Sequence, residues 1–113
     1  MAQDCLFCRI VAGEIPCTKV YEDEEVLAFR DINPQAPTHV LVIPKAHVGN
    51  IASMPSGDVL GPVFAAAAKV ACQEGIDKSG YRLVFNVGAD AGETVPHLHL
   101  HVLGGRALCW PPG

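Results

Sequence analysis

The sequence predicts an α+β fold, namely a five-stranded antiparallel sheet with one long and one short helix. Segments rich in β-branched and aliphatic residues alternate with helix-forming segments in the order helix, three strands, helix, two strands. The links between successive strands are short, which suits antiparallel pairing. The expected strands cover residues 18–21, 26–29, 38–43, 81–87 and a stretch that begins at residue 97, and the expected helices cover residues 5–12 and 56–74.

Length and composition favour one globular domain over residues 1–113. A chain of 113 residues, 50% of them hydrophobic and 18% charged, is long enough for one core and too short for two. Its formal net charge of -4 disfavours a nucleic-acid-binding surface, which would be basic. The five cysteines are an odd number at uneven spacing, which favours reduced thiols over a disulfide framework.

The chain shows no signal for secretion or for membrane insertion. The N-terminus lacks the basic start, apolar run and cleavage site of a signal peptide. The longest apolar run covers residues 59–68 and is too short to cross a bilayer. We therefore expect a cytoplasmic protein without a membrane partner.

The short helix has clear end signals. Asp4 is expected to cap its N-terminus, and Gly13, followed by Ile15-Pro16, is expected to end it. The helical period then places Phe7 and Ile10 on one side.

The long helix is expected to begin after a capping serine, Ser56, and to stop near Gly75. Pro62 falls past the first turn of a helix that starts there, so we expect a kink or a later start. The apolar side that should pack on the sheet includes Leu60, Phe64 and Val70.

Three histidines alternate with aliphatic residues in the last expected strand. His97, His99 and His101 would share one face, about 6.6 Å apart, because successive side chains of a strand point to opposite faces. Such imidazoles can supply a nucleophile, an acid or base, and donors to an anion. The alternatives are a water-facing amphipathic strand and a short metal-binding histidine tract. The residues expected to enter the core from the other face are Leu98, Leu100 and Val102.

A stiff loop and the strand after it bring further polar groups. The loop over residues 31–37 contains Pro34 and Pro37, whose rings restrict the backbone, so it can hold Asp31 in place. The strand that follows contains His39 among aliphatic residues. Taken alone, a histidine in such a run is more often part of a core or an edge than of a catalytic site.

The loop before the histidine strand has the composition of an anion-binding loop. Residues 88–94 include glycines whose backbone N–H groups can approach a ligand oxygen, and Thr94 adds a hydroxyl. Together they predict an oxyanion or phosphate cradle, although ordinary turns use glycine as often.

The segment His97-Leu98-His99-Leu100-His101-Val102-Leu103 matches the histidine-triad pattern, and the chain resembles the Hint branch of the histidine-triad (HIT) nucleotide-binding proteins. The likeness covers nearly the whole chain, and the flanking segments occur in the same order as in that family. These segments are residues 27–32, 34–39, 42–45, 81–82 and 104–113.

The resemblance implies a purine nucleoside phosphoramidase or nucleotide hydrolase that releases AMP or GMP through a covalent nucleotidyl-histidine. His99 would be the nucleophile that attacks the α-phosphorus. His101 would contact the phosphate oxygens and assist proton transfer, and His39 would complete the cluster. His97 would serve either the phosphate or a metal.

The resemblance also implies a substrate pocket. Asp31 would accept hydrogen bonds from the ribose hydroxyls, and Thr94, Asn86 and the Gly92 amide would lie near the phosphate. The residues of the purine pocket would be Phe7, Ile10, Phe29 and Ile32, although such residues also serve as ordinary core packing.

A homodimer is implied in the same way, with two sheets joined edge to edge. The C-terminal tail, including Trp110, would then lie near the partner's site and contribute to substrate binding. An exposed edge strand favours such pairing, because its backbone groups lack partners in the monomer.

Cys5 and Cys8 form a C-x-x-C pair, which is half of a closed zinc site. The resemblance to bacterial-type members that bind zinc suggests His47 and His97 as the other two ligands. A structural Zn²⁺ there would fasten the short helix to the sheet and leave no open position for chemistry. Without a metal, the pair is two reduced cysteines.

Three other activities stay open at this point. A metalloenzyme would hold a catalytic zinc with His97, His99 and another histidine. A binding module would hold a purine nucleotide without turnover. A dinucleoside polyphosphate hydrolase is the nearest rival within the family, and the ending Trp110-Pro111-Pro112-Gly113 favours the Hint branch over it.

Overall fold

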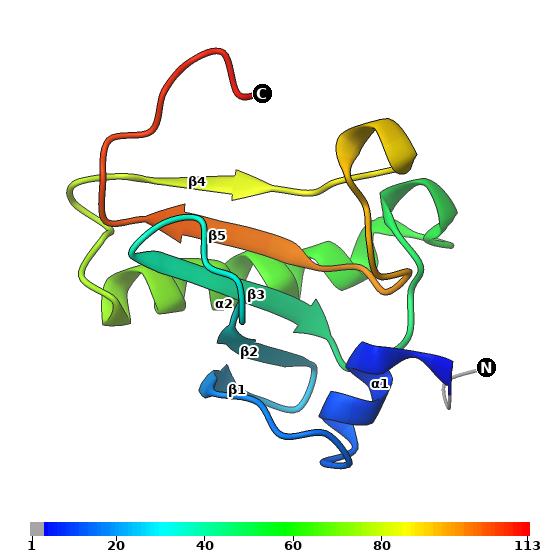
Figure 1. Cartoon of the computed structure of the whole chain (residues 1–113). Helices are drawn as coiled ribbons and strands as arrows, with labels where there is room; N and C mark the ends of the chain where they lie inside the picture. Colours follow the sequence, from blue (N-terminus) through cyan, green and yellow to red (C-terminus); the bar gives the residue numbers. More distant parts are fainter. Residues whose placement is uncertain (1–3) are drawn as a thin grey trace.

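A computed structural model of the chain describes residues 4–113, in which five antiparallel strands form one sheet between two helices (Figure 1). The strands are β1 (Lys19–Glu22), β2 (Val26–Arg30), β3 (Thr38–Pro44), β4 (Tyr81–Val84) and β5 (Leu100–Gly104), and the helices are α1 (Leu6–Val11) and α2 (Leu60–Gln73). Their order in the sheet is β1-β2-β3-β5-β4, and every neighbouring pair is antiparallel. The predicted α+β fold is confirmed.

Each face of the central strands carries a buried cluster, one beneath α2 and one that includes Phe7 of α1 (Figure 1). Alternate residues of β2 and β3 point toward α2 and the others toward α1, as the strand period requires. The central strand β3 is buried along its whole length for this reason. The core beneath α2 contains Val26, Ala28, Val40, Val42, Leu100 and Val102, and the core beneath α1 contains Phe7, Leu27, Phe29, Leu41 and Ile43.

The pairing of β3 with β5 determines where two of the histidines lie. His39 pairs with Leu103, and Leu41 pairs with His101. His39 and His101 are therefore diagonal neighbours on the α1 side of the sheet. The predicted core-facing residues Leu98, Leu100 and Val102 are buried.

The regular histidine strand begins at Leu100, three residues later than predicted. A turn precedes it, in which the N–H of His97 donates to the carbonyl of Val95. His97 and His99 therefore lie before the strand and His101 lies on it, so the three do not share one regular strand face. The His97 side chain is fully buried.

Helix α1 is capped by Cys5, which corrects the expectation that Asp4 is the cap. The Cys5 Sγ accepts a hydrogen bond from the N–H of Cys8 at 3.4 Å. Gly13 ends the helical segment as expected, with a φ of 81° that favours glycine. The helix has only six residues because Cys5 and Gly13, which fix its two ends, are only eight positions apart.

Helix α2 starts later than Ser56, as Pro62 suggested. Ser56 caps a preceding 3₁₀ turn, η3 (Gly57–Val59), and Pro62 lies in the first turn of α2, where a missing N–H breaks no bond. Val70 packs on the sheet as predicted, but Phe64 is 41% exposed. The buried face instead consists mainly of small residues at helical spacing, Val63, Ala66, Ala67, Val70 and Ala71. No helix within residues 4–113 is long and apolar enough to cross a membrane.

Candidate functional site

A cavity of about 420 Å³ opens on the α1 side of the sheet. Its walls come from α1 and the turn after it, from β2 and the loop that follows, and from the segment that leads into β5. This volume lies in the range of small-molecule sites in proteins. The predicted site residues that line it are Phe7, Ile10, Phe29, Asp31, Ile32, Thr94, His99 and His101.

Three predicted substrate residues lie outside the lining of this cavity. Asn86 is half-buried and Gly92 is exposed, both on the loop between β4 and β5. Trp110 is 80% exposed, and the Arg82 guanidinium lies 5.9 Å from its ring centre. Trp110 was expected to act in the site of a partner subunit, so a single chain leaves its role a prediction.

Six further lining residues were missed by the sequence analysis. Leu6 precedes Phe7 on α1, and Ile15-Pro16 forms the turn that was expected only to end the helix. The missed residues are close in sequence to predicted pocket residues, and that closeness was the signal that could have identified them. An argument from helical periodicity alone does not use it. The six are Leu6, Ile15, Pro16, Arg30, Leu41 and Val95.

The ring of Phe7 links the cavity to the buried histidines. Its centre lies 5.5 Å from that of Phe29 and 5.1 Å from that of His99, both in edge-on contacts. On another side it lies 5.9 Å from the ring of His97. Edge-on contacts of this kind fix ring orientation, so Phe7 helps to hold both imidazoles in place.

His99 has a defined tautomer. It is 8% exposed, and its Nδ1 lies 2.7 Å from the carbonyl oxygen of His97. A carbonyl oxygen can only accept, so Nδ1 carries a proton, and in the neutral ring Nε2 is left with the lone pair. A neutral imidazole with its lone pair available is the form that can act as a nucleophile or a base.

His39 and His101 form a buried hydrogen-bonded pair beside His99. The His39 Nε2 lies 2.9 Å from the His101 Nδ1 and 3.4 Å from the Oδ2 of Asp31. Burial lowers the pKa of His39 and lowers the pKa of His101 to about 4. Positive charge on His99 and His39 would lower the pKa of His101 further, whereas Asp31 opposes the shift. Both imidazoles are therefore neutral at neutral pH.

The loop before β5 is held in shape by one carboxylate. Glu93 Oε1 accepts hydrogen bonds from the N–H of Gly88 at 2.7 Å and from the Asn50 amide at 3.1 Å. These bonds lower the pKa of Glu93. Gly88 and Gly92 both have positive φ, of 86° and 84°, so this loop needs glycine at those places. The loop thereby positions the next residue, Thr94, at the cavity.

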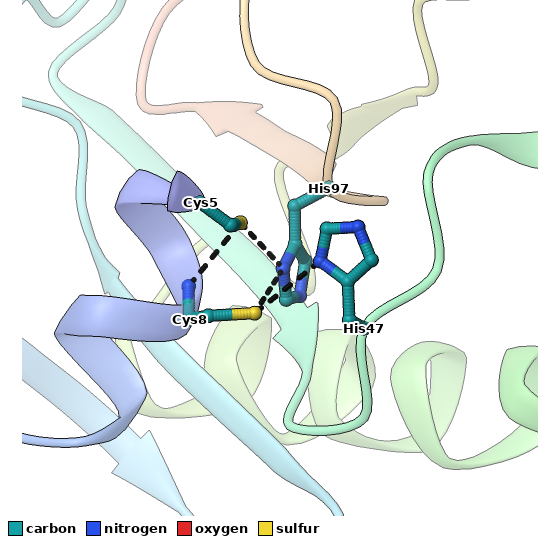
Figure 2. Close-up of side chains that lie close together, drawn as sticks. All are labelled: Cys5, Cys8, His47 and His97. Atoms are coloured by element: carbon teal, nitrogen blue, oxygen red, sulfur yellow. Dashed lines mark hydrogen bonds between the residues drawn. The ribbon is translucent and has the colours of Figure 1, made fainter. Parts of the chain in front are cut away.

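Two cysteines of the α1 segment and two histidines form a compact cluster (Figure 2). The His97 Nδ1 lies 3.2 Å from the Cys5 Sγ and 3.5 Å from the Cys8 Sγ. The His47 Nδ1 lies 3.3 Å from the Cys8 Sγ. All four ligand atoms lie within 4.8 Å of one another, so the four predicted metal ligands are brought together.

The protonation pattern of this cluster fits a metal. The Nε2 of His97 donates to the carbonyl oxygen of Pro44 at 2.8 Å, which leaves the lone pair of Nδ1 for a metal ion. Burial raises the pKa of the Cys8 thiol to about 11, with Cys5 adding to the shift, so a metal must displace that proton when it binds. Two sulfur and two nitrogen ligands make the closed tetrahedral set typical of structural zinc.

Comparison with known proteins decides the family. The chain matches the HIT domain over residues 12–108. It belongs to the HIT domain family. The family likeness inferred from the sequence is thereby confirmed, whereas the branch within the family rests on the resemblance alone.

Relatives of this HIT protein cover all or nearly all of its length. An uncharacterized HIT-like protein of Synechococcus elongatus is 49% identical over 100% of both chains. A 14 kDa zinc-binding protein of Zea mays is 50% identical over 96% of this chain and 87% of its own. The crystal structure of a HIT family hydrolase of Legionella pneumophila has a TM-score of 0.94 and 54% identity, covering 97% of this chain and 100% of its own.

The contacts of Glu93 in the loop before β5 predict how the stability of this HIT domain depends on pH. The bonds to Glu93 stabilise its charged form, so its contribution to stability is present above the ordinary glutamate pKa of about 4.3 and is lost as pH falls through the lower folded value. We expect Glu93→Gln to unfold at lower urea concentration than the wild type at pH 7, with a difference that narrows below about pH 4.

The matched control is Glu24→Gln, which changes an exposed glutamate in the turn between β1 and β2. Urea unfolding at both pH values, followed by circular dichroism, measures the difference. Equal pH dependence in the two variants would show that Glu93 does not hold the loop through its charge.

Proposed function

We propose that this protein is a purine nucleoside phosphoramidase or nucleotide hydrolase of the Hint branch, which cleaves at the α-phosphate and releases AMP or GMP. The observation that supports this most is the tautomer of His99, whose Nε2 lone pair is free on a residue that lines a nucleotide-sized cavity. The names of solved relatives as HIT family hydrolases are in keeping with it.

The proposed reaction has two displacements at phosphorus. The Nε2 of His99 attacks the α-phosphorus, a nitrogen–phosphorus bond to the enzyme forms, and the bond to the leaving amine breaks as the amine takes a proton from solvent. Water then attacks the same phosphorus, restores free His99 and releases the nucleoside monophosphate. Splitting one displacement into two is the advantage of a covalent nucleophile.

The cavity lining supports purine recognition. Phe7, Phe29 and Ile10 offer an apolar slot for a flat base, and Ile32 is fully exposed at the entrance. The Oδ1 of Asp31 accepts from the N–H of Asn33 at 2.8 Å, which fixes a carboxylate that we assign to the ribose hydroxyls. Thr94 would donate to the phosphate or to the leaving group, and we keep Asn86, Gly92 and the partner's Trp110 as proposed outer contacts.

The alternatives have less support. In an open catalytic zinc site, His97 and His99 would both need free nitrogens directed at one metal. Instead both nitrogens of His97 lie against the cysteines and Pro44, and the Nδ1 of His99 is bound to a carbonyl. A binding module without turnover and a dinucleoside polyphosphate hydrolase are compatible with the same cavity, and the assay below separates them.

Adenosine 5′-phosphoramidate is the diagnostic substrate. We expect the wild type to release AMP from it, and His99→Ala to lose at least about 1,000-fold in kcat while it stays folded, because the covalent step is gone. Mass spectrometry of rapidly quenched wild type should show an adenylyl adduct on His99. Folded wild type that binds AMP but releases none from this substrate would leave the binding module, and preference for a dinucleoside polyphosphate would favour the rival hydrolase.

We further propose that Cys5, Cys8, His47 and His97 hold a structural Zn²⁺. The compact S₂N₂ cluster supports this, and related proteins of Zea mays and Brassica juncea are named zinc-binding proteins. Zinc supplies a fixed crosslink in such closed sites and no open position for substrate. It would tie α1, which provides part of the cavity wall, to the end of β3 and to the turn before β5.

Cysteine substitution tests the zinc proposal. We expect Cys8→Ser to lose the zinc that copurifies with the wild type and to lower the free energy of unfolding by about 3 kcal/mol or more, because metal binding stabilises the native state. Cys72→Ser is the control, since Cys72 is an exposed cysteine on α2. Atomic absorption and urea unfolding measure both effects. Full zinc content in Cys8→Ser would contradict the assigned ligand set.

We propose a homodimer that forms through the exposed edge of the sheet at β4. Strand β4 is an outer strand, and exposed apolar side chains lie on it and next to it, namely Leu83, Val87 and Phe64. Pairing of two β4 edges would cover them. We expect sedimentation equilibrium at micromolar concentration to give the mass of a dimer for the wild type and of a monomer for Leu83→Glu. A monomeric wild type would end the proposal.

A further inference from the structure

A main-chain donor sets the tautomer of His39. The N–H of Gln35 donates to the Nδ1 of His39 at 3.0 Å. An amide N–H cannot accept, so this nitrogen carries no proton. Gln35 is also held at its own carbonyl, in the next peptide unit, because Arg106 donates to that oxygen at 2.8 Å, and Pro34 and Pro37 restrict the loop around it.

The other nitrogen of His39 must then carry the proton in the neutral ring. Its surroundings agree, because the carboxylate of Asp31, which can only accept, lies 3.4 Å from the His39 Nε2. Gln35 and Asp31 thus assign the same proton position, one at each nitrogen of the ring.

His39 in turn sets the tautomer of His101. Since the His101 Nδ1 accepts the Nε2–H of His39, the proton of neutral His101 lies on its own Nε2. That nitrogen is buried and has no hydrogen-bond partner among residues 4–113. A buried donor without a partner is costly in a folded protein, and here it belongs to a residue that lines the cavity.

We propose that His39 is a positioning residue that locks His101 in its neutral Nε2–H form, so that His101 gives the phosphate a fixed hydrogen bond and keeps its proton throughout the reaction. This inference rests on the proposed function. It narrows the role expected from the resemblance, in which His101 also assists proton transfer.

Protonation of His101 is opposed by the geometry of the pair. A second proton on its Nδ1 would face the Nε2–H of His39 at 2.9 Å. His39 cannot become the acceptor there unless it takes a proton on Nδ1 and loses the bond from Gln35. Burial acts in the same direction, and the titratable groups that face His101 are Asp31 after β2, His39 on β3 and His99 just before β5.

Nuclear magnetic resonance tests the tautomers without any assay of activity. Two-bond ¹H–¹⁵N spectra of the full chain, loaded with zinc and labelled with ¹⁵N-histidine, distinguish the two neutral tautomers from the cation. We expect His101 to be a neutral Nε2–H ring from about pH 5 to pH 8 and His39 to be a neutral Nε2–H ring at neutral pH. A proton on the Nδ1 of His101, or titration of His101 near its ordinary pKa of about 6.5, would overturn the proposal whether or not the protein hydrolyses phosphoramidates.

Two substitutions at position 39 separate positioning from proton transfer. In His39→Gln the side-chain amide can donate to the His101 Nδ1 but cannot exchange a proton, whereas His39→Leu offers no donor. We expect His39→Leu to lower kcat about 100-fold and its pH profile of kcat to gain an inflection near pH 6.5, because His101 is then free to titrate. We expect kcat of His39→Gln to be at least about tenfold higher than that of His39→Leu, without the inflection.

Folding and binding are monitored alongside, by circular dichroism and by the Kd for AMP. Equal loss of kcat in folded His39→Gln and His39→Leu would show that His39 moves a proton, against the proposal. If the wild type has no turnover, the proposed function fails, and the tautomer measured in the wild type still decides whether His39 locks His101.

Discussion

Both candidate sites depend on the antiparallel pairing of β3 with β5. Within the pair, the register places His39 diagonally opposite His101. Beyond the ends of the pair, Pro44 and His47 follow β3, and His97 precedes β5, so the same pairing brings the metal ligands together. Because β3 is buried on both faces, a shift of one residue would move the polar ring of His39 into the core beneath α2. The core therefore enforces the register on which the chemistry depends.

Helix α1 joins the two sites. Six residues are too few for a stable helix in water, so α1 needs its contacts with the sheet and the cluster to keep its shape. Cys5 and Cys8 face the metal cluster, whereas Phe7 and Ile10 face the cavity. A structural metal would thus act on the proposed purine pocket by fixing the helix that provides one of the walls of the cavity, with no part in the proposed displacement at phosphorus.

The sequence predicted those features that follow from periodicity and from local signals. Alternation indicated that Leu100 and Val102 enter the core, and Pro62 indicated a late start for α2. Phe64 was expected in the core from its helical position, but small residues, mainly alanines, make the buried face of α2, and Phe64 is 41% exposed, in edge-on contact with Phe85.

The predicted metal ligands and cavity residues came from the family resemblance. The structure adds long-range contacts and histidine tautomers, which the sequence does not show. Glu93 holds the loop through contacts with residues five and forty-three positions away, so sequence spacing gives no sign of them. The tautomers of the histidines depend on the acceptors and donors around each ring, among them the carbonyl of His97 and the N–H of Gln35. Main-chain groups of this kind are identical at every position of the sequence and become specific only in the fold.

The cavity offers a phosphate neutral donors rather than a free positive charge. Among its lining residues Arg30 is the one lysine or arginine that the described chain provides, and both oxygens of Glu74 bind its guanidinium at 2.8 and 2.9 Å. The α-phosphate of a nucleoside phosphoramidate bears one negative charge, whereas that of a free monophosphate approaches two at neutral pH. The penalty for burying charge rises steeply with its magnitude, and neutral imidazole donors offset less of it than a cation would. Such a cavity would hold the proposed substrate more firmly than the proposed product, and the increase in charge on hydrolysis would itself promote release of AMP.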